Sequence, residues 1–296
     1  MWDLTQRFSN NNHPAFTDEE VLTIYLFGVI RGHGQVREIY DYTHDHLLDW
    51  FPNLPGYEGY LHRLNRCSYA FSGFIDHLLE QIPNNELLAT CRITDSMPIV
   101  IAGAKRSGTA RVAPEIADKG YCSTKNMWYY GVKLHMLTIA RAFCMPVPEY
   151  IGVSQGSAND LAILRSILPN LQDTDLYGDK IYADQALVEQ LETEKNVHLY
   201  TPIKKAKEQV RLPLIDQVCS IHVSKIRQPI ESLFNWIEEE TGIQRASKVR
   251  SYNGLMVHVF GKLARCYVFP RFQLLIRILQ YSSSILRRGA VTLAPR

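Results

Sequence analysis

Three acidic residues of this sequence lie where regular structure is expected to present a carboxylate. Asp95 interrupts the otherwise apolar residues 92–101, which have the composition of a strand. Asp179 lies at the end of a short strand expected within residues 175–182, and Glu231 lies near the start of a long expected helix. An ionised carboxylate inside an apolar strand costs several kcal/mol unless it is paired or binds a metal. Asp95 therefore requires a partner or a cation.

Carboxylates of this kind suit a hard divalent cation, because Mg²⁺ takes oxygen ligands and keeps several waters. Two such ions about 3.5–4 Å apart can activate a water or a 3′-hydroxyl and stabilise the leaving oxygen of a phosphodiester. Each acid also has a structural interpretation. Asp95 could bond to backbone amides, and Asp179 could pair with Lys180. Glu231 could be favoured by the dipole of its helix. Asp184 competes with Asp179 for the second position, but it has the position of a helix cap.

The first ninety residues are predicted to be helical. Thr17 and Glu20 have the spacing of a capping box, and apolar residues follow at helical intervals. A second helix is predicted over residues 36–50 and a third over residues 61–79. Residues 1–90 contain 5 Lys+Arg and 12 Asp+Glu, which makes them a poor general phosphate-binding surface. Structural support or protein–protein contact is at least as good an interpretation as DNA binding.

The pattern of the middle of the chain changes to strands alternating with helices. The strand that contains Asp95 is expected to end or be disturbed at Pro98, and residues 102–126 are expected to form a loop. The further predicted elements are strands at 128–140, 147–153, 175–182 and 197–202 and helices at 158–168 and 184–195. Two antiparallel strands followed by this alternation predict a mixed β-sheet covered by helices.

A long helix is predicted around residues 226–237, where apolar residues mark one face and Gly242 ends the helix. Proline is tolerated in the first helical turn and not later. Pro229 therefore predicts that Glu231 lies in the opening turn and that Arg227 precedes the regular helix.

Taken together and in this order, four motifs resemble those of DDE transposases from bacterial insertion sequences. They are Asp95-Ser-Met-Pro, Tyr130-Gly-Val-Lys-Leu-His135, Gly178-Asp-Lys-Ile-Tyr182 and Arg227-Gln-Pro-Ile-Glu231. The resemblance extends over about residues 15–268, and the order of the motifs is much more specific than any one of them. The sequence departs from the usual pattern twice, because Ser224 stands where Tyr is usual and Glu238 where Lys is usual.

The resemblance implies an RNase H-like catalytic domain, with a mixed β-sheet flanked by helices, that binds two Mg²⁺ or Mn²⁺ ions. It implies that Asp95, Asp179 and Glu231 are the catalytic and metal-binding acids. It also makes Arg227 part of the same motif. A four-residue spacing on a helix places Arg227 on the face of Glu231, where it could orient the acid or hold a DNA phosphate.

Basic residues are concentrated at the other end of the chain, where residues 241–296 contain 10 Lys+Arg and no acidic residue. Such segregation predicts a surface for a polyanion, or a basic tail that pairs with the acidic first third. The resemblance implies that the partner is DNA, both terminal inverted repeats and target DNA, and that paired ends are held by a homo-oligomer. The candidate DNA-binding or orienting residues are Arg227, Lys133, Lys204, Lys205, Arg245, Lys248 and Arg250.

Composition and length predict one large domain or two modest ones, since the 296 residues are 46% hydrophobic and 21% charged. We expect a helical module over residues 1–90, a catalytic domain over residues 91–268 and a basic tail over residues 269–296. No apolar run reaches the ~18–20 residues that a membrane span needs. The expected location is the cytoplasm, in association with the nucleoid.

The resemblance implies the function of a transposase, which cleaves the ends of its element and joins the freed 3′-hydroxyl to target DNA. Two alternatives stay open. One is a domesticated or decayed copy that binds DNA without strand transfer, and the other is a nuclease of the same fold that only cleaves.

Overall fold

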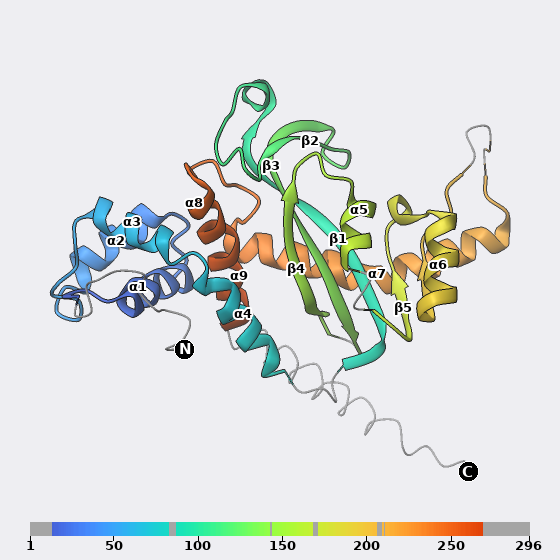
Figure 1. The fold of residues 1–296 in the computed structure, drawn as a ribbon, viewed down its shortest axis with the longest axis horizontal. Helices are drawn as coiled ribbons and strands as arrows, with labels where there is room; N and C mark the ends of the chain where they lie inside the picture. Colours follow the sequence, from blue (N-terminus) through green and yellow to red (C-terminus); the bar gives the residue numbers. More distant parts are fainter. Residues whose placement is uncertain are drawn as a thin grey trace, which may run out of the picture.

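The computed structural model describes residues 14–82, 87–142, 144–167, 171–205, 209 and 211–268. The predicted tail over residues 269–296 lies outside them. The N-terminal helices lie at one side of a central sheet and α6 lies at the other, while the long helix α7 crosses one face of the sheet (Figure 1). No helix in the described ranges has both the length and the apolar character that a membrane crossing requires.

The N-terminal part forms four helices: α1 (Asp18–Ile30), α2 (Val36–His46), α3 (Tyr57–Arg66) and α4 (Ala70–Glu80). The capping box that begins α1 is confirmed, since Thr17 Oγ1 accepts from the Glu20 amide and the Glu20 carboxylate accepts from the Thr17 amide. The single third helix of the prediction is wrong. A turn at residues 67–69 divides it into α3 and α4, and each of these helices buries apolar side chains of its own.

The sheet has the strand order β2-β3-β1-β5-β6, and β4 also pairs with β3. Its strands are β1 (Leu87–Gly103), β2 (Asp118–Cys122), β3 (Met127–Arg141), β4 (Val147–Gln155), β5 (Thr174–Tyr177) and β6 (Val197–Tyr200). β3 is antiparallel to β1 and to β4, whereas β5 is parallel to both β1 and β6. Helices α5 (Asp160–Ile167) and α6 (Gln185–Lys195) supply the crossovers. The predicted mixed sheet flanked by helices, of the RNase H-like kind, is confirmed.

Several details of the sheet differ from the prediction. The strand predicted over residues 175–182 ends at Tyr177, so Asp179 lies just beyond it. β1 continues through Pro98 to Gly103, because β5 pairs only with Cys91–Ile93 and leaves that edge of β1 free where the proline lacks an amide hydrogen. The predicted loop over residues 102–126 contains a strand, β2, whose pairing with β3 depends on residues beyond the loop.

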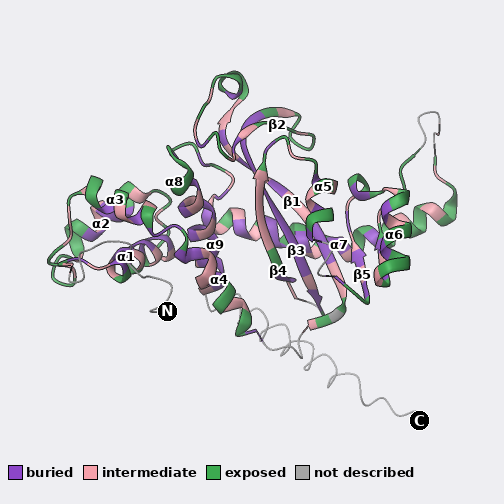
Figure 2. Cartoon of the chain, viewed as in Figure 1, coloured by how far each residue is buried: buried purple, intermediate pink, exposed green. Residues whose placement is uncertain are grey.

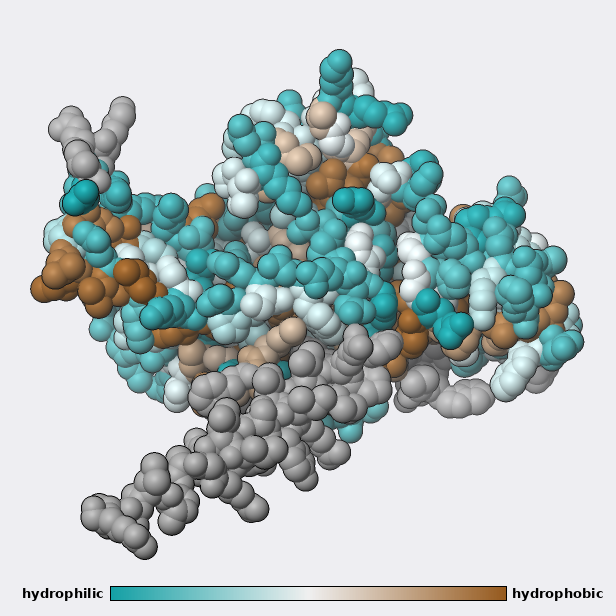
Figure 3. Space-filling model, turned by 180° about the vertical axis from the view of Figure 1, so that it is seen from behind, coloured by the Kyte–Doolittle hydropathy of each residue, from teal (hydrophilic) through white to brown (hydrophobic). Residues whose placement is uncertain are grey.

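Helix α7 (Leu214–Thr241) is longer than predicted and contains Pro229 in its interior. The expectations that Glu231 lies in the opening turn and that Arg227 precedes the regular helix are therefore wrong. Buried apolar side chains follow the proline at 230, 233, 234 and 237, and their packing outweighs the roughly 3 kcal/mol that an interior proline costs. The helix ends as predicted at Gly242, in the left-handed conformation. Four apolar side chains at its beginning, Leu214, Ile215, Val218 and Ile221, are exposed and contribute to an apolar patch at that end of the molecule (Figure 3).

The chain returns to the N-terminal helices after α7. Helix α8 (Tyr252–Met256), the π-helical turn η6 (Val257–Gly261) and α9 (Lys262–Val268) pack against α1, α3 and α4, and α9 also contacts α7. Buried residues run from these helices into the sheet and α7 as one core (Figure 2). A smaller core lies on the other face of the sheet, where α5 and α6 cover β5 and β6. The two faces of β1 thus meet different helices.

Candidate active site

Asp95 lies on the face of β1 that is packed against α7. Side chains alternate along a strand, so Asp95 shares this face with Ile93 and Met97, which are buried in the core that contains residues of α7. Only 22% of the Asp95 side chain is exposed. Its Oδ1 accepts a hydrogen bond from the amide of Ser96 at 2.8 Å, which leaves Oδ2 directed to another partner.

Asp179 comes beside Asp95 because β1 and β5 are parallel neighbours. The register pairs Ile93 with Tyr177, the last residue of β5. Asp95 and Asp179 each lie two positions beyond this pair in the same chain direction. Asp179 caps a short 3-10 turn, η5 (Lys180–Tyr182), by accepting from the Lys180 amide at 2.7 Å. A side chain at position 178 would approach the ring of Tyr182 to 2.8 Å, so this glycine is required by the packing of that ring.

Arg227 and Glu231 come from α7, one helical turn apart. The Arg227 guanidinium is buried, with 8% of the side chain exposed, and it contacts all three acids. Its Nη2 donates to Asp95 Oδ2 at 3.1 Å and lies 3.9 Å from Glu231 Oε1, while its Nη1 lies 3.7 Å from Asp179 Oδ1. The three carboxylates that are far apart in the sequence therefore converge on one arginine.

The charges of this cluster are unequal, since three carboxylates face one guanidinium. The pKa of Asp95 is raised to about 6, chiefly by burial; Arg227 and the Ser96 amide oppose this rise, and the nearby Asp179 and Glu231 carboxylates add to it. The remaining nitrogen of Arg227, Nε, is buried without a hydrogen-bond partner among the described residues. At neutral pH the cluster retains net negative charge, which a divalent cation would neutralise.

The donor chemistry of the cluster suits a hard cation, because carboxylate oxygens are the ligands that Mg²⁺ prefers. Within the described ranges, however, no group of three or more His, Cys, Asp or Glu side chains is arranged to hold a metal ion. The acids contact Arg227 instead. The residues fit a divalent cation in kind and in charge, and metal binding requires the carboxylates to exchange contacts with Arg227 for contacts with the ion.

The candidate Lys133 lies on the opposite face of the sheet. Met136, which pairs with Asp95, is an odd number of positions from Lys133 along β3, so the two side chains point to opposite faces of the sheet. The Lys133 Nζ contacts Asp160 Oδ1 at 3.0 Å and the Ala158 carbonyl at 2.8 Å. His135 lies on the same face as Lys133, and burial lowers its pKa to about 4. Asp160, the acid that both side chains approach, was not among the site residues predicted from the sequence.

The other basic candidates form separate groups. Lys204 and Lys205 are exposed after β6. Arg245, Lys248 and Arg250 are exposed after α7, where they line a cavity against the N-terminal helices. None of these five side chains contacts the three acids in the described structure. The predicted role of Asp184 as a cap is confirmed, since its Oδ1 accepts from the Leu187 amide at the start of α6.

Comparison with known families is informative for the sheet and α7. Residues 87–251, more than half of the chain, match a family model described as a transposase DDE domain. Neither the curated proteins nor the solved structures gave a match. The matched range contains the three acids and Arg227, and it ends where α8 begins.

Proposed function

The chain belongs to the transposase DDE-domain family, and on this premise we propose that it cleaves DNA at the ends of its element and transfers the freed 3′-hydroxyl to target DNA. The observation that carries this proposal is the convergence of Asp95, Asp179 and Glu231 on Arg227. Asp95 lies in β1, Asp179 follows the neighbouring parallel strand β5, and Glu231 lies one turn from Arg227 in the helix that crosses them. Asp95 and Asp179 are far from Arg227 in the sequence, so only the tertiary fold brings them to this guanidinium.

We assign Asp95, Asp179 and Glu231 as the residues that would hold Mg²⁺, or Mn²⁺ in its place, with two ions expected. When bound, such ions activate the attacking oxygen and stabilise the leaving oxygen of a phosphodiester. The protein's own contribution is positioning. β1 and β5 fix the two aspartates relative to each other, and α7 fixes Glu231 above them. Burial keeps Asp95 in surroundings where electrostatic interactions are strong.

Arg227 is proposed as the positioning residue of the site. Its guanidinium has little exposed surface and contacts each acid at 3.1–3.9 Å, so it holds like charges close together before a cation binds. Without such a counter-charge, three carboxylates at this distance would repel one another and favour protonation.

The substrate follows from the family and the basic residues. We propose that Lys204, Lys205, Arg245, Lys248 and Arg250 contact DNA phosphates, and that Lys133 supports the sheet through Asp160. Terminal inverted repeats and target DNA are the proposed partners. Two ends joined together require a homo-oligomer on the DNA, and a DNA substrate implies a cytoplasmic, nucleoid-associated location.

Two assays test the proposed function. Nicking of supercoiled plasmid with Mg²⁺, compared with EDTA, reports phosphodiester cleavage. A duplex that ends in a pre-cleaved 3′-hydroxyl, incubated with target plasmid, reports strand transfer. Nicking together with strand transfer supports a transposase. Nicking without strand transfer would indicate a nuclease, and DNA binding without nicking would indicate a DNA-binding protein that has lost catalysis.

A further inference from the structure

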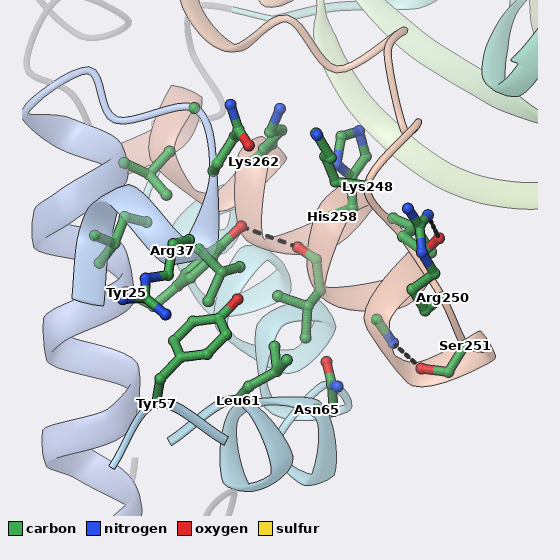
Figure 4. A pocket seen from close by; sticks show the side chains of 18 of the residues that line it. Tyr25, Arg37, Tyr57, Leu61, Asn65, Lys248, Arg250, Ser251, His258 and Lys262 are labelled. Atoms are coloured by element: carbon green, nitrogen blue, oxygen red, sulfur yellow. Dashed lines mark hydrogen bonds between the residues drawn. The ribbon is translucent and has the colours of Figure 1, made fainter. Parts of the chain in front are cut away.

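A cavity of about 440 Å³ lies between the N-terminal helices and the segment that follows α7 (Figure 4). One wall comes from α1, α2 and α3, including Arg37, Tyr57 and Asn65. The other wall comes from residues 245–262, and side chains from both walls are labelled in the close-up. The cavity is separate from the three acids, none of which lines it. Its size is within the range of about 300–1,000 Å³ typical of ligand sites.

The lining of this cavity is cationic. Five basic side chains contribute to it, and no aspartate or glutamate is among the described residues that line it: Arg37, Arg245, Lys248, Arg250 and Lys262. Among the described residues, Arg245, Lys248 and Arg250 form no ion pair with an acid, although Arg250 donates to two backbone carbonyls. Positive charge that lacks an acidic partner on the second wall is electrostatically unfavourable without an anion nearby.

Lys262 is the buried member of the group, with 5% of its surface exposed. Its Nζ has one long contact, 3.5 Å to the Gly242 carbonyl, and burial lowers its pKa to about 8. Glu238 and Glu38 partly offset this effect of burial. An ammonium group that has been taken out of water still gains more from a bound anion than an exposed lysine does.

Three acids lie near the cavity without lining it. Glu38 accepts from the amides of Gly34 and Gln35, Glu238 accepts from the amide of Gln244, and the charges of both act on Lys262. Asp41 pairs with Arg37 at 2.8 Å, but both side chains are well exposed and such a pair is weak. An incoming anion therefore competes with these carboxylates for Arg37 and Lys262, whereas Arg245, Lys248 and Arg250 have no acidic partner among the described residues.

One wall of the cavity is attached directly to the strand that carries Asp95. Val100 of β1 donates to the Gln244 carbonyl at 2.8 Å, and its own carbonyl accepts from the Ala246 amide at 2.9 Å. Arg245 lies between these two bonds, in a bridge to Val100. A ligand bound by Arg245 is thus held at a fixed position relative to the catalytic strand, and a ligand that also contacts Arg37 connects the N-terminal helices to it.

We propose that this cavity binds a phosphate group of the DNA backbone, contacted from both walls, by Arg37 on one side and by Arg245, Lys248, Arg250 and Lys262 on the other. The inference rests on the proposed function, because it takes DNA as the polyanion. It gives the acidic N-terminal module a specific place in DNA binding, since one basic residue of that module, Arg37, completes a site that the basic segment after α7 begins.

The test is a double-mutant cycle on the full-length chain with Arg37→Gln, Lys248→Gln and the double variant. Affinity for a 30-base-pair duplex of arbitrary sequence is measured in EDTA over a range of salt concentrations. Arg165→Gln is the control, because this residue is an exposed arginine of α5, away from the cavity. Each cavity variant should lower affinity severalfold and reduce the salt slope by about one, while the control changes neither. Two side chains on one phosphate should give a double variant that loses less than the product of the single losses.

Three outcomes would overturn the proposal. Affinity unchanged in both cavity variants would exclude a DNA phosphate, and equal losses in the control would show a general charge effect. Inorganic phosphate that stabilises the native chain but not the double variant against heat, with DNA binding unaltered, would assign the cavity to free phosphate. Plasmid nicking with Mg²⁺ is measured separately. If the chain does not nick plasmid but its variants show the coupled loss of affinity, the proposed catalysis is refuted and the phosphate site is supported. If the chain nicks plasmid but its variants show no coupled loss, only the phosphate site is refuted.

Discussion

The two clusters of charged residues in this protein differ in the charge that surrounds their arginines. At the candidate active site one buried guanidinium, that of Arg227, contacts three carboxylates of the same chain. In the cavity between the N-terminal helices and residues 245–262, five basic side chains line a space to which no described acid contributes. Both clusters join segments that are distant in the sequence, and both lie close to β1.

The difference indicates what each cluster can bind. Excess carboxylate at the first cluster leaves negative charge for a cation, and excess basic charge at the second leaves positive charge for an anion. A metal-dependent enzyme acting on DNA needs both. The variants and pH changes below alter the charge of one of the two clusters at a time.

The largest expected effect is on cleavage. Asp95→Asn removes a carboxylate from the first cluster, and we expect plasmid nicking with Mg²⁺ to fall by about three orders of magnitude or more, since several kcal/mol of transition-state stabilisation depends on the metal site. DNA affinity should stay within about tenfold of the original. Asp184→Asn is the matched control, because Asp184 caps α6 and asparagine is an equally good cap. A large loss of DNA binding in Asp95→Asn would refute a purely catalytic role.

The next effect concerns stability. Arg227→Met leaves three carboxylates without their shared counter-charge, and we expect the free energy of unfolding to fall by about 2–3 kcal/mol after allowing for the partial exposure of the acids. Lys248→Met in the cavity should cost nothing, because it removes repulsion. Urea denaturation at pH 7 measures both. If Arg227→Met and Lys248→Met lowered the free energy of unfolding equally, the two clusters would not differ in how far acidic residues neutralise their basic side chains.

The pH dependence of stability should have opposite signs at the two clusters. Burial lowers the pKa of His258, which lines the cavity, to about 3 from its ordinary 6.5. The unfolded chain therefore binds more protons between these values, so the stability from neutral His258 is present above pH 6.5 and is lost as the pH falls. At pH 5 the loss is about 2 kcal/mol. The raised pKa of Asp95 acts the other way, because the folded chain binds more protons between its ordinary 3.8 and about 6.

His258→Gln isolates this contribution. Unfolding measured at pH 7 and pH 5 should show a difference smaller by about 2 kcal/mol than in the original chain. His135, whose pKa burial lowers to about 4, stays in place and continues to contribute acid sensitivity. An unchanged difference would show that His258 does not titrate abnormally in the folded protein.

The smallest effect is expected for a single exposed side chain of the cavity. Arg250→Ala should weaken DNA binding severalfold for every sequence and reduce the slope of log K against log salt by about one. A slope that does not change means that this arginine does not touch a phosphate.

Much of the fold followed from the sequence because the responsible interactions are local. The capping box of Thr17 and Glu20, the cap at Asp184 and the end of α7 at Gly242 each involve residues within a few positions of one another. The order of strands and helices, and with it the mixed sheet, followed from periodicity in the same way. Asp95 was conspicuous as a charge inside an apolar strand, but the choice of Asp95, Asp179 and Glu231 as one set came from the resemblance of the motifs to DDE transposases.

Tertiary structure decided whatever depends on distant partners. Pro229 reads as a helix start, yet α7 begins at Leu214, because packing on the sheet offsets the local cost of the proline. Lys133 was a candidate DNA-binding residue in the sequence, yet its side chain contacts Asp160, which lies 27 residues further along the chain. Arg37 and Lys248 line the same cavity, and no local pattern in the sequence predicts that they do. Hydrogen bonds within one turn are specified by neighbouring residues, whereas contacts between residues distant in the sequence depend on how the whole hydrophobic core packs.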